Sequence, residues 1–233
     1  MGETVDWLTA SEQWSGPDGI PARLLEHIWY SALGVAVAAL IAFPLGLLIG
    51  HTGRGSLAAN TLSNFWRALP TLGLVILVFR LEPLSIWPVL VALVVIAIPP
   101  ILLNTDVGIR SIDPGVRDAA RGMGMTGWQA LWRVEVPLAM PLILAGFRSA
   151  SGQVIATATI AAFVGLGGLG RYIIDGYSVR DIGEISGGAI VVALLALAVE
   201  GVFALLQRSL GPKERTRRRR VAGPAVHPEE VHA

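Results

Sequence analysis

One short charged segment lies between two long apolar stretches and is the best candidate for a functional surface. It contains Asp118-Ala119-Ala120, a glycine four residues later at Gly124, and the ending Val134-Glu135-Val136-Pro137. Small residues beside a carboxylate offer a surface that the backbone of another protein can approach closely. We therefore interpret residues 113–137, here named the elbow, as a docking surface through which a soluble partner acts on the apolar part of the chain.

The elbow is predicted to contain two short helices. Asp113-Pro114 offers an N-cap followed by a proline at the first helical position, where a missing N–H costs nothing. Four residues with apolar or small side chains then recur at helical spacing on one face: Val116, Ala119, Ala120 and Met123. Gly124 permits a sharp change of direction, and Thr126–Gln129 has the form of a capping box for the second helix. Pro137 and Pro141 are then expected to break the second helix and to start the next apolar run.

A second interpretation of the elbow stays open. An amphipathic helix on the membrane surface would place Trp128 and Trp132 at the depth of the lipid headgroups without any partner. The full spacing, with Gly124 and Pro137 at fixed distances from the acidic residue, favours docking over this alternative.

The composition excludes most soluble classes of protein. Of the 233 residues, 53% are hydrophobic and only 15% are charged, and the mean hydropathy is +0.62. Such a chain is expected to have lipid as its solvent. It has no cysteine, which excludes disulfides and thiolate chemistry. The four histidines are too scattered for a ligand cluster, so neither a metal nor another cofactor is expected.

Five runs approach the roughly 20 residues that a helix needs to cross a bilayer. They are Ile28–Gly50, Leu57–Phe79, Leu84–Leu103, Pro141–Val164 and Gly187–Gln207. Because an unpaired backbone donor in hydrocarbon is costly, each run should be helical. The sequence thus predicts an all-α, polytopic membrane protein with about five transmembrane helices.

Basic residues predict the direction of these helices. With the amino terminus outside, the inner segments hold most of the arginines and lysines, among them Arg54, Arg110, Arg117, Arg121, Arg133 and Arg217–Arg220. The positive-inside rule therefore favours an external amino terminus, a cytoplasmic carboxyl terminus and a cytoplasmic elbow. We expect an extracytoplasmic segment over 1–26 without a cleaved signal peptide, a transmembrane domain over 27–208, and a basic, disordered tail over 209–233 that contacts lipid and not nucleic acid.

Polar residues inside the predicted spans are candidates for a pathway. Asn64 and Arg67 lie on one face of the second run with Asn60, while Arg148, Gln153 and Thr157 make the fourth run two-sided. Each residue has a plainer alternative, either as a snorkelling arginine or as an interhelical hydrogen-bonding group. Glu200, deep in the last run, is expected to meet an arginine of a neighbouring helix or subunit.

The segment Gly165–Gly170 matches the dinucleotide spacing Gly-x-Gly-x-x-Gly, but it ends an apolar run and lies in no βαβ unit. Two interpretations are kept: a closely packed outer turn in which Gly167 and Gly168 help to gate the pathway, or a plain helix terminator. The chain lacks a Gly-x-x-x-x-Gly-Lys-Ser/Thr phosphate loop, so it is not itself an ATPase.

The elbow resembles the EAA signature of ABC-importer permeases of the MetI-like type. The usual glutamate is Asp118 here, and the usual isoleucine and leucine are Val134 and Val136. Further segments are similar to permeases for glycine betaine, carnitine, choline and related osmoprotectants: His27–Ser31, Phe43–Gly46, Arg67–Pro70, Ile98–Asn104, Ala145–Ser149 and Ile160–Gly170. The similarity extends from about His27 to Gln207.

This resemblance implies a type I importer permease fold, in which the elbow is the coupling helix that docks on a separate ABC ATPase subunit. Asp118, Ala119, Ala120, Gly124 and Pro137 take that coupling role by resemblance. It also implies a second permease subunit, identical or different, an extracellular solute-binding protein, and a location in the plasma membrane. The expected cargo is an osmoprotectant such as glycine betaine, carnitine, choline or proline.

Three alternatives remain at this stage. The permease could carry another small solute such as an amino acid, or the chain could be an ion-coupled secondary transporter. Inverted repeats and midplane ionisable residues are typical of secondary transporters, and the sequence shows no repeat and one isolated Glu200. A membrane scaffold without transport is the third alternative.

Overall fold

The computed structural model describes residues 2–68, 70–81 and 86–210, and every regular element in this part of the chain is helical. The elements are α1 (Gly2–Thr9), η1 (Ser11–Trp14), α2 (Ile20–Thr52), α3 (Ser56–Ala68), α4 (Thr71–Leu81), α5 (Trp87–Arg110), α6 (Pro114–Gly122), α7 (Gly127–Ala130), η2 (Leu131–Glu135), α8 (Val136–Ala158), η3 (Thr159–Val164), α9 (Gly170–Val179) and α10 (Ile182–Leu210). The prediction of an all-α fold is confirmed. Most of the predicted tail lies outside the described residues.

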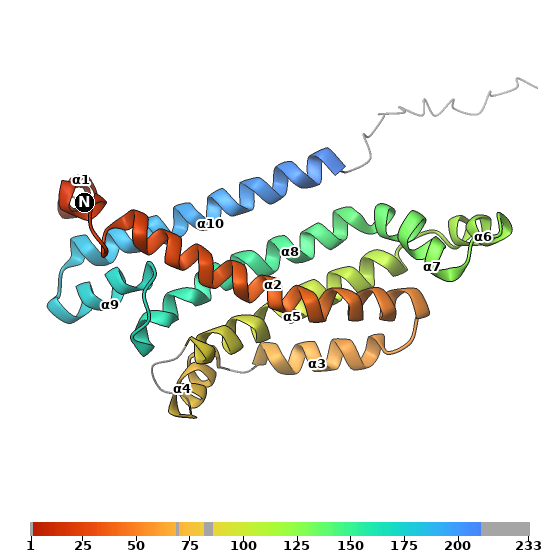
Figure 1. Ribbon diagram of the computed structural model, residues 1–233, viewed down its shortest axis with the longest axis horizontal. Helices are drawn as coiled ribbons and strands as arrows, with labels where there is room; N and C mark the ends of the chain where they lie inside the picture. Colours follow the sequence, from red (N-terminus) through yellow and green to blue (C-terminus); the bar gives the residue numbers. More distant parts are fainter. Residues whose placement is uncertain (1, 69, 82–85, 211–233) are drawn as a thin grey trace, which may run out of the picture.

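Four helical stretches of the described chain are long and apolar enough to cross a membrane. They are Ile20–Thr52, Trp87–Arg110, Gly127–Val164 and Ile182–Leu210, and they lie side by side along the long axis of the molecule (Figure 1). The first begins at Ile20, eight residues before the predicted Ile28, because Gly19-Ile20-Pro21 starts a helix with its proline in the first turn.

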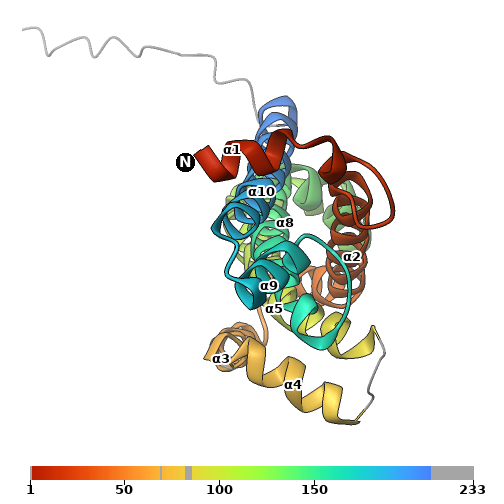
Figure 2. The ribbon, with the colours of Figure 1, turned by 90° about the vertical axis from the view of Figure 1, so that its left-hand side faces the viewer.

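The predicted second span is wrong as a single helix. Its residues form α3 and α4, which end and begin on either side of Pro70 and point in different directions (Figure 2). Proline lacks the backbone donor that a continuing helix needs, and it disfavours the helical conformation in the residue before it. The two helices still return the chain, so that α5 runs in the same direction as α2 (Figure 1).

A stripe of small residues sets the spacing between α2 and α5. Every fourth residue of α2 along this stripe is buried: Gly34, Ala38, Ala42, Gly46 and Gly50. A Cβ atom on Gly34 would lie 2.8 Å from the Cβ of Leu93, and one on Gly50 would lie 2.7 Å from the Cβ of Ile109. Helices in lipid approach closely where small residues allow it. The stripe therefore allows α2 to pack closely on α5 along its length.

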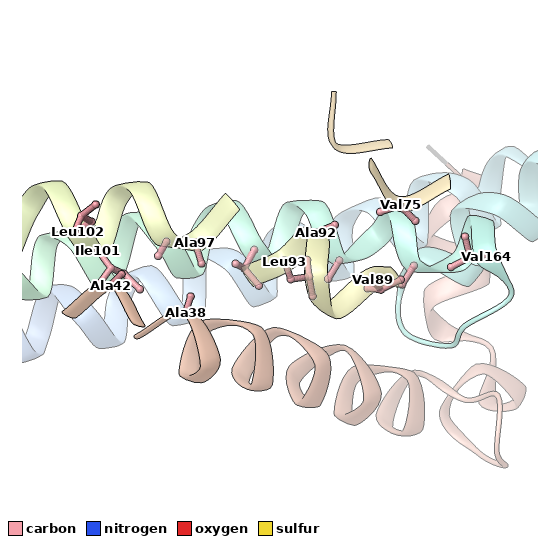
Figure 3. Close-up of a cluster of buried hydrophobic side chains, with 14 of the residues drawn as sticks. Ala38, Ala42, Val75, Val89, Ala92, Leu93, Ala97, Ile101, Leu102 and Val164 are labelled. Atoms are coloured by element: carbon pink, nitrogen blue, oxygen red, sulfur yellow. The ribbon is translucent and has the colours of Figure 1, made fainter. Parts of the chain in front are cut away.

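The main buried cluster lies where α2, α5 and α8 meet. Figure 3 shows Ala38 and Ala42 of α2 beside Leu93, Ala97 and Ile101 of α5. On the other side of α5, Gly146 of α8 fits closely, since a Cβ there would lie 2.8 Å from the carbonyl oxygen of Pro100. α10 packs on α8 and α9, which leaves α5 as the central helix.

The two ends of the helix bundle carry different structures. α1 and α9 cover one end, while α6 and α7 project from the other (Figure 1). At the first end, the rings of Trp7 and Tyr172 meet edge to face at 5.0 Å, and the Tyr172 hydroxyl donates to the Asp18 carbonyl at 2.6 Å. Burial raises the pKa of Tyr172 to about 12, so this donor stays protonated at neutral pH.

Candidate functional site: the elbow

The first elbow helix begins and ends as its residues predict. The backbone N–H of Gly115 donates to Asp113 Oδ1 at 2.7 Å, and Pro114 follows this cap as the first helical residue. After α6, Gly124 has a φ of +77°, a left-handed conformation that glycine adopts at low cost. The chain therefore turns sharply at Gly124, as expected.

The second elbow helix is continuous with the third membrane-length stretch. Thr126 and Gln129 form both hydrogen bonds of a capping box at the start of α7, which confirms that prediction. One π-helical segment, η2, then joins α7 to α8, and helical structure continues through Pro137 and Pro141, so the break predicted at these prolines is wrong. The rings of Trp128 and Trp132 contact each other at 5.4 Å and both side chains are exposed.

The outer face of α6 differs from the predicted one at a single residue. Asp118 is largely exposed, with 72% of its side chain accessible, and Val116, Ala119 and Met123 are exposed beside it. Ala120, expected among them, is only 1% exposed. The expected exposure of Ala120 is therefore wrong, because α6 lies back on its own chain at this residue, and its role in coupling stays a prediction.

Beneath α6 lies a cluster of charged and polar side chains that the sequence did not predict. His51 Nδ1 lies 2.8 Å from Glu135 Oε2, and Arg117 Nε lies 3.4 Å from Glu135 Oε1. Arg117 Nη2 also donates to the Ile109 carbonyl at 2.6 Å. From the sequence alone, Glu135 is assigned no role. A carboxylate at the start of an apolar run was the signal that could have found it.

With this geometry in place, similarity to known proteins decides the family. The model of the family "Binding-protein-dependent transport system inner membrane component" matches residues 42–216. The chain belongs to this family. It is the permease component of an ABC importer, and such a component works with an ATPase and a binding protein.

Relatives of this permease extend over most of its length. The glycine betaine/carnitine/choline transport system permease protein OpuCB of Bacillus subtilis is 36% identical over 188 residues, which cover 81% of this chain and 87% of the relative. The osmoprotectant import permease protein OsmW of Salmonella typhimurium is 38% identical over 193 residues, with 81% and 90% covered. The family assignment sets aside the ion-coupled and scaffold alternatives.

The fold of the permease matches solved importers at low sequence identity. A chain of the MetNI methionine ABC transporter in an inward-facing conformation aligns with a TM-score of 0.71 and 19% identity, covering 83% of this chain and 96% of that one. A chain of an amino acid ABC transporter aligns with a TM-score of 0.66 and 19% identity, covering 81% and 92%. This likeness confirms the MetI-type fold.

The structure does not bring the two groups of candidate pathway residues together in one chain. Asn64 is exposed on α3, and Arg67 lies one turn further along the same helix. α3 packs against α5 on the side away from α10 (Figures 1 and 2). Gln153 and Thr157 lie on α8, where Gln153 Nε2 donates to Ser149 Oγ at 3.1 Å. The role of these residues in a pathway stays a prediction.

Arg148 is paired within the chain, which favours a structural role for this residue over a role in gating the pathway. Its guanidinium forms an ion pair with Glu200 of α10, and its Nη1 donates to Gln207 Oε1 at 3.0 Å. Gln207 in turn donates to the Pro141 carbonyl at 3.2 Å. Glu200 thus meets an arginine, as expected, and the partner lies in the same chain. The group acts as a brace between α8 and α10.

Replacing Glu200 by leucine is expected to lower the amount of folded permease severalfold, because Arg148 would keep its charge at membrane depth without a counter-ion. Replacing both residues, Arg148→Met with Glu200→Leu, should recover most of the loss. Size-exclusion profiles after heating in detergent measure both effects. Equal stability of the single and double variants would contradict a bracing role.

The glycine loop after η3 is packed tightly against α2. The backbone N–H of Gly168 donates to Glu26 Oε2 at 2.7 Å, and Arg23 Nη1 donates to the same oxygen at 2.9 Å. A Cβ atom on Gly167 would overlap the Glu26 carboxylate. Gly165 and Gly168 both have positive φ. The close packing expected of this turn is present, and its role as a gate stays a prediction.

Proposed function

We propose that this permease imports osmoprotectants of the glycine betaine, carnitine and choline type. The observation that carries the proposal is the identity of 34–36% with curated relatives whose names state these solutes, together with 38% to a relative named as an osmoprotectant import permease. Proline stays a further candidate by the resemblance described above. The likeness to methionine and amino acid transporters, at 19% identity, concerns the fold alone and does not favour those cargoes.

Selection of the solute is assigned to the separate binding protein. Quaternary ammonium groups are commonly held in cages of several aromatic rings. The aromatic contacts in the described part of the chain are pairs, such as Phe43 with Phe147 at 6.2 Å. These pairs do not form a cage in the described part of the spans. The permease would therefore provide the route for the solute, and the binding protein would provide the high-affinity binding site.

The elbow end of the bundle is proposed to face the cytoplasm. Basic residues gather there: Arg54, Arg110, Arg117, Arg121, Arg133 and Arg208. Arg208 lies near the end of α10, on the same side as α6 and α7 (Figure 1). Arg23, Arg171 and Arg180 belong to the opposite end. The positive-inside rule then supports an external amino terminus and a cytoplasmic carboxyl terminus.

In this orientation α6 is the coupling helix. The exposed residues Asp118, Ala119, Val116 and Met123 would contact the ATPase, while Gly124 and Pro137 shape the elbow behind them. ATP binding would close two ATPase subunits, move the elbows of two paired permeases, and switch the pathway from inward-facing to outward-facing. The energy enters as different affinities of the ATPase for the two permease states. The second permease is an identical or a homologous chain.

Uptake by the purified complex in proteoliposomes tests the cargo. The complex is reconstituted with ATP inside the vesicles and with its binding protein outside. Radiolabelled glycine betaine, carnitine and choline should accumulate only with ATP, and methionine should not. Accumulation of methionine, with none of the three quaternary amines, would overturn the substrate assignment.

Replacing Asp118 by lysine is expected to release the ATPase from the permease. The side chain is exposed, and its ion pair with Arg121 at 3.6 Å lies on the surface, where such pairs contribute only about 0–1 kcal/mol to stability. The fold should therefore survive while docking is lost. Co-purification of the ATPase measures docking, and Asp175→Asn at the opposite end is the control. Wild-type co-purification and uptake by Asp118→Lys would contradict docking through α6.

A further inference from the structure

The charged cluster beneath α6 joins three elements, of which α2 lies far from the other two in sequence. His51 lies in the last turn of α2, Arg117 in α6, and Glu135 at the end of η2. One carboxylate oxygen of Glu135 is hydrogen-bonded with His51, and the other forms an ion pair with Arg117 without a hydrogen bond. Arg117 adds a fourth element, because it donates to Ile109 near the end of α5. One carboxylate thus holds the end of α2 and the middle of α6 at the start of α8.

Burial makes these contacts matter more than ordinary surface pairs. The Glu135 side chain is 4% exposed, whereas those of Arg117 and His51 are 22% and 26% exposed. A buried carboxylate without partners would be strongly unfavourable. His51 lies in the last turn of α2, and Arg117 sits near the carboxyl end of α5, where the helix dipole favours its positive charge. The cluster therefore fixes where the ends of these helices lie relative to each other.

The connection along the backbone explains why such a fastening is needed. Between α6 and α7 the chain passes through Gly124, whose Cβ position has no atoms within 4 Å. Gly124 therefore has no side-chain contact, and α6 is held against the rest of the chain at the buried Ala120 and through Arg117. From α7 onward, helical structure continues through η2 into α8. The pair between Arg117 and Glu135 crosses the turn and ties α6 directly to the base of that continuous helix.

We propose that Glu135 is a positioning residue for transport, which with Arg117 and His51 transmits displacement of the coupling helix to α2, α5 and α8. The inference rests on the proposed docking of α6 to the ATPase. Without the cluster, α6 would still bind the ATPase, but its movement would be taken up at the Gly124 turn. ATP hydrolysis would then continue without a matching amount of transport.

The test compares Glu135→Gln with Glu135→Asp in the reconstituted complex. Glutamine keeps the size of the side chain and loses its charge, whereas aspartate keeps the charge on a shorter stem. For Glu135→Gln we expect the ATPase to co-purify and to hydrolyse ATP, while solute transported per ATP falls about tenfold, within the range of typical coupling effects. Glu135→Asp should recover part of the loss. Asp175→Asn, which breaks the 2.8 Å pair with Arg171 at the opposite end, should leave the ratio unchanged.

A double variant separates coupling from simple loss of stability. Since Arg117 and Glu135 act through one contact, Arg117→Gln with Glu135→Gln should lower the transport-to-ATP ratio no further than either single change. Multiplying effects, or an equal fall of transport and hydrolysis in Glu135→Gln, would overturn the inference. Failure of the proposed docking gives a different result. Asp118→Lys would then retain the ATPase and transport normally, whatever the result of the Glu135 variants.

Discussion

Replacing Gly46 by leucine is expected to abolish accumulation of the folded permease. Even a single Cβ atom at Gly46 would lie 2.7 Å from Thr105 Cβ and 2.9 Å from the Leu102 carbonyl oxygen. The carbonyl belongs to the backbone of α5 and cannot rotate away as a side chain would. Overpacking of this kind costs about 1–3 kcal/mol or more. A leucine would force α2 off α5 along the stripe from Gly34 to Gly50.

A graded series at the same residue sharpens this prediction. Gly46→Ala adds the Cβ alone and should give a smaller but measurable loss, read from the amount of monodisperse protein after solubilisation and from its melting temperature. Gly201→Leu is the matched control, because Gly201 lies in α10 with no atom near its Cβ position. Normal accumulation of Gly46→Leu would show that the contact between α2 and α5 is looser than described.

Replacing Gly124 by proline is expected to eliminate transport while the membrane part still folds. Gly124 has a φ of +77°, whereas proline fixes φ near −65°. The backbone N–H of Gly124 also donates to the Arg121 carbonyl at 2.9 Å, and proline has no such donor. The turn between α6 and α7 must therefore change direction, which would carry the docking face away from the ATPase.

Uptake and co-purification of the ATPase measure this effect. Gly16→Pro is the control, since Gly16 has a similar φ of +83° and open space around it but lies at the other end of the molecule. Gly124→Ala should be milder, because a non-glycine residue in the left-handed region costs about 1–2 kcal/mol. If Gly124→Pro transported at the wild-type rate, the elbow would have no part in coupling.

The elbow was predictable from the sequence because its structure is local. The Asp113 side chain accepts from the backbone N–H two residues later, and the Thr126 side chain accepts from the one three residues later. Gly124 turns the chain through its own backbone conformation. None of these depends on the rest of the fold. The exposure of Ala120 could not be predicted in the same way, since it depends on how α6 lies on the remainder of the chain.

The sequence does not predict features that depend on the direction of a helix or on contacts between residues far apart in the chain. Hydropathy over residues 57–79 measures how apolar a run is, but it does not show that the helix stops before Pro70 and starts again in another direction. His51 and Glu135 are 84 residues apart, and Arg148 and Glu200 are 52 apart. Sequence reasoning could state that Glu200 needs an arginine, whereas only the packing of α10 on α8 shows which one.

The unbroken helix from Gly127 to Ala158 has a mechanical consequence. At 1.5 Å per residue its 32 residues, which include the π-helical segment η2, Pro137 and Pro141, measure about 48 Å, so a tilt of the whole stretch by about 5° would displace the far end by about 4 Å. That far end leads into the glycine loop held by Glu26. A small movement of the ATPase at one membrane face would in this way displace the glycine loop at the opposite face by a distance close to the width of a small solute.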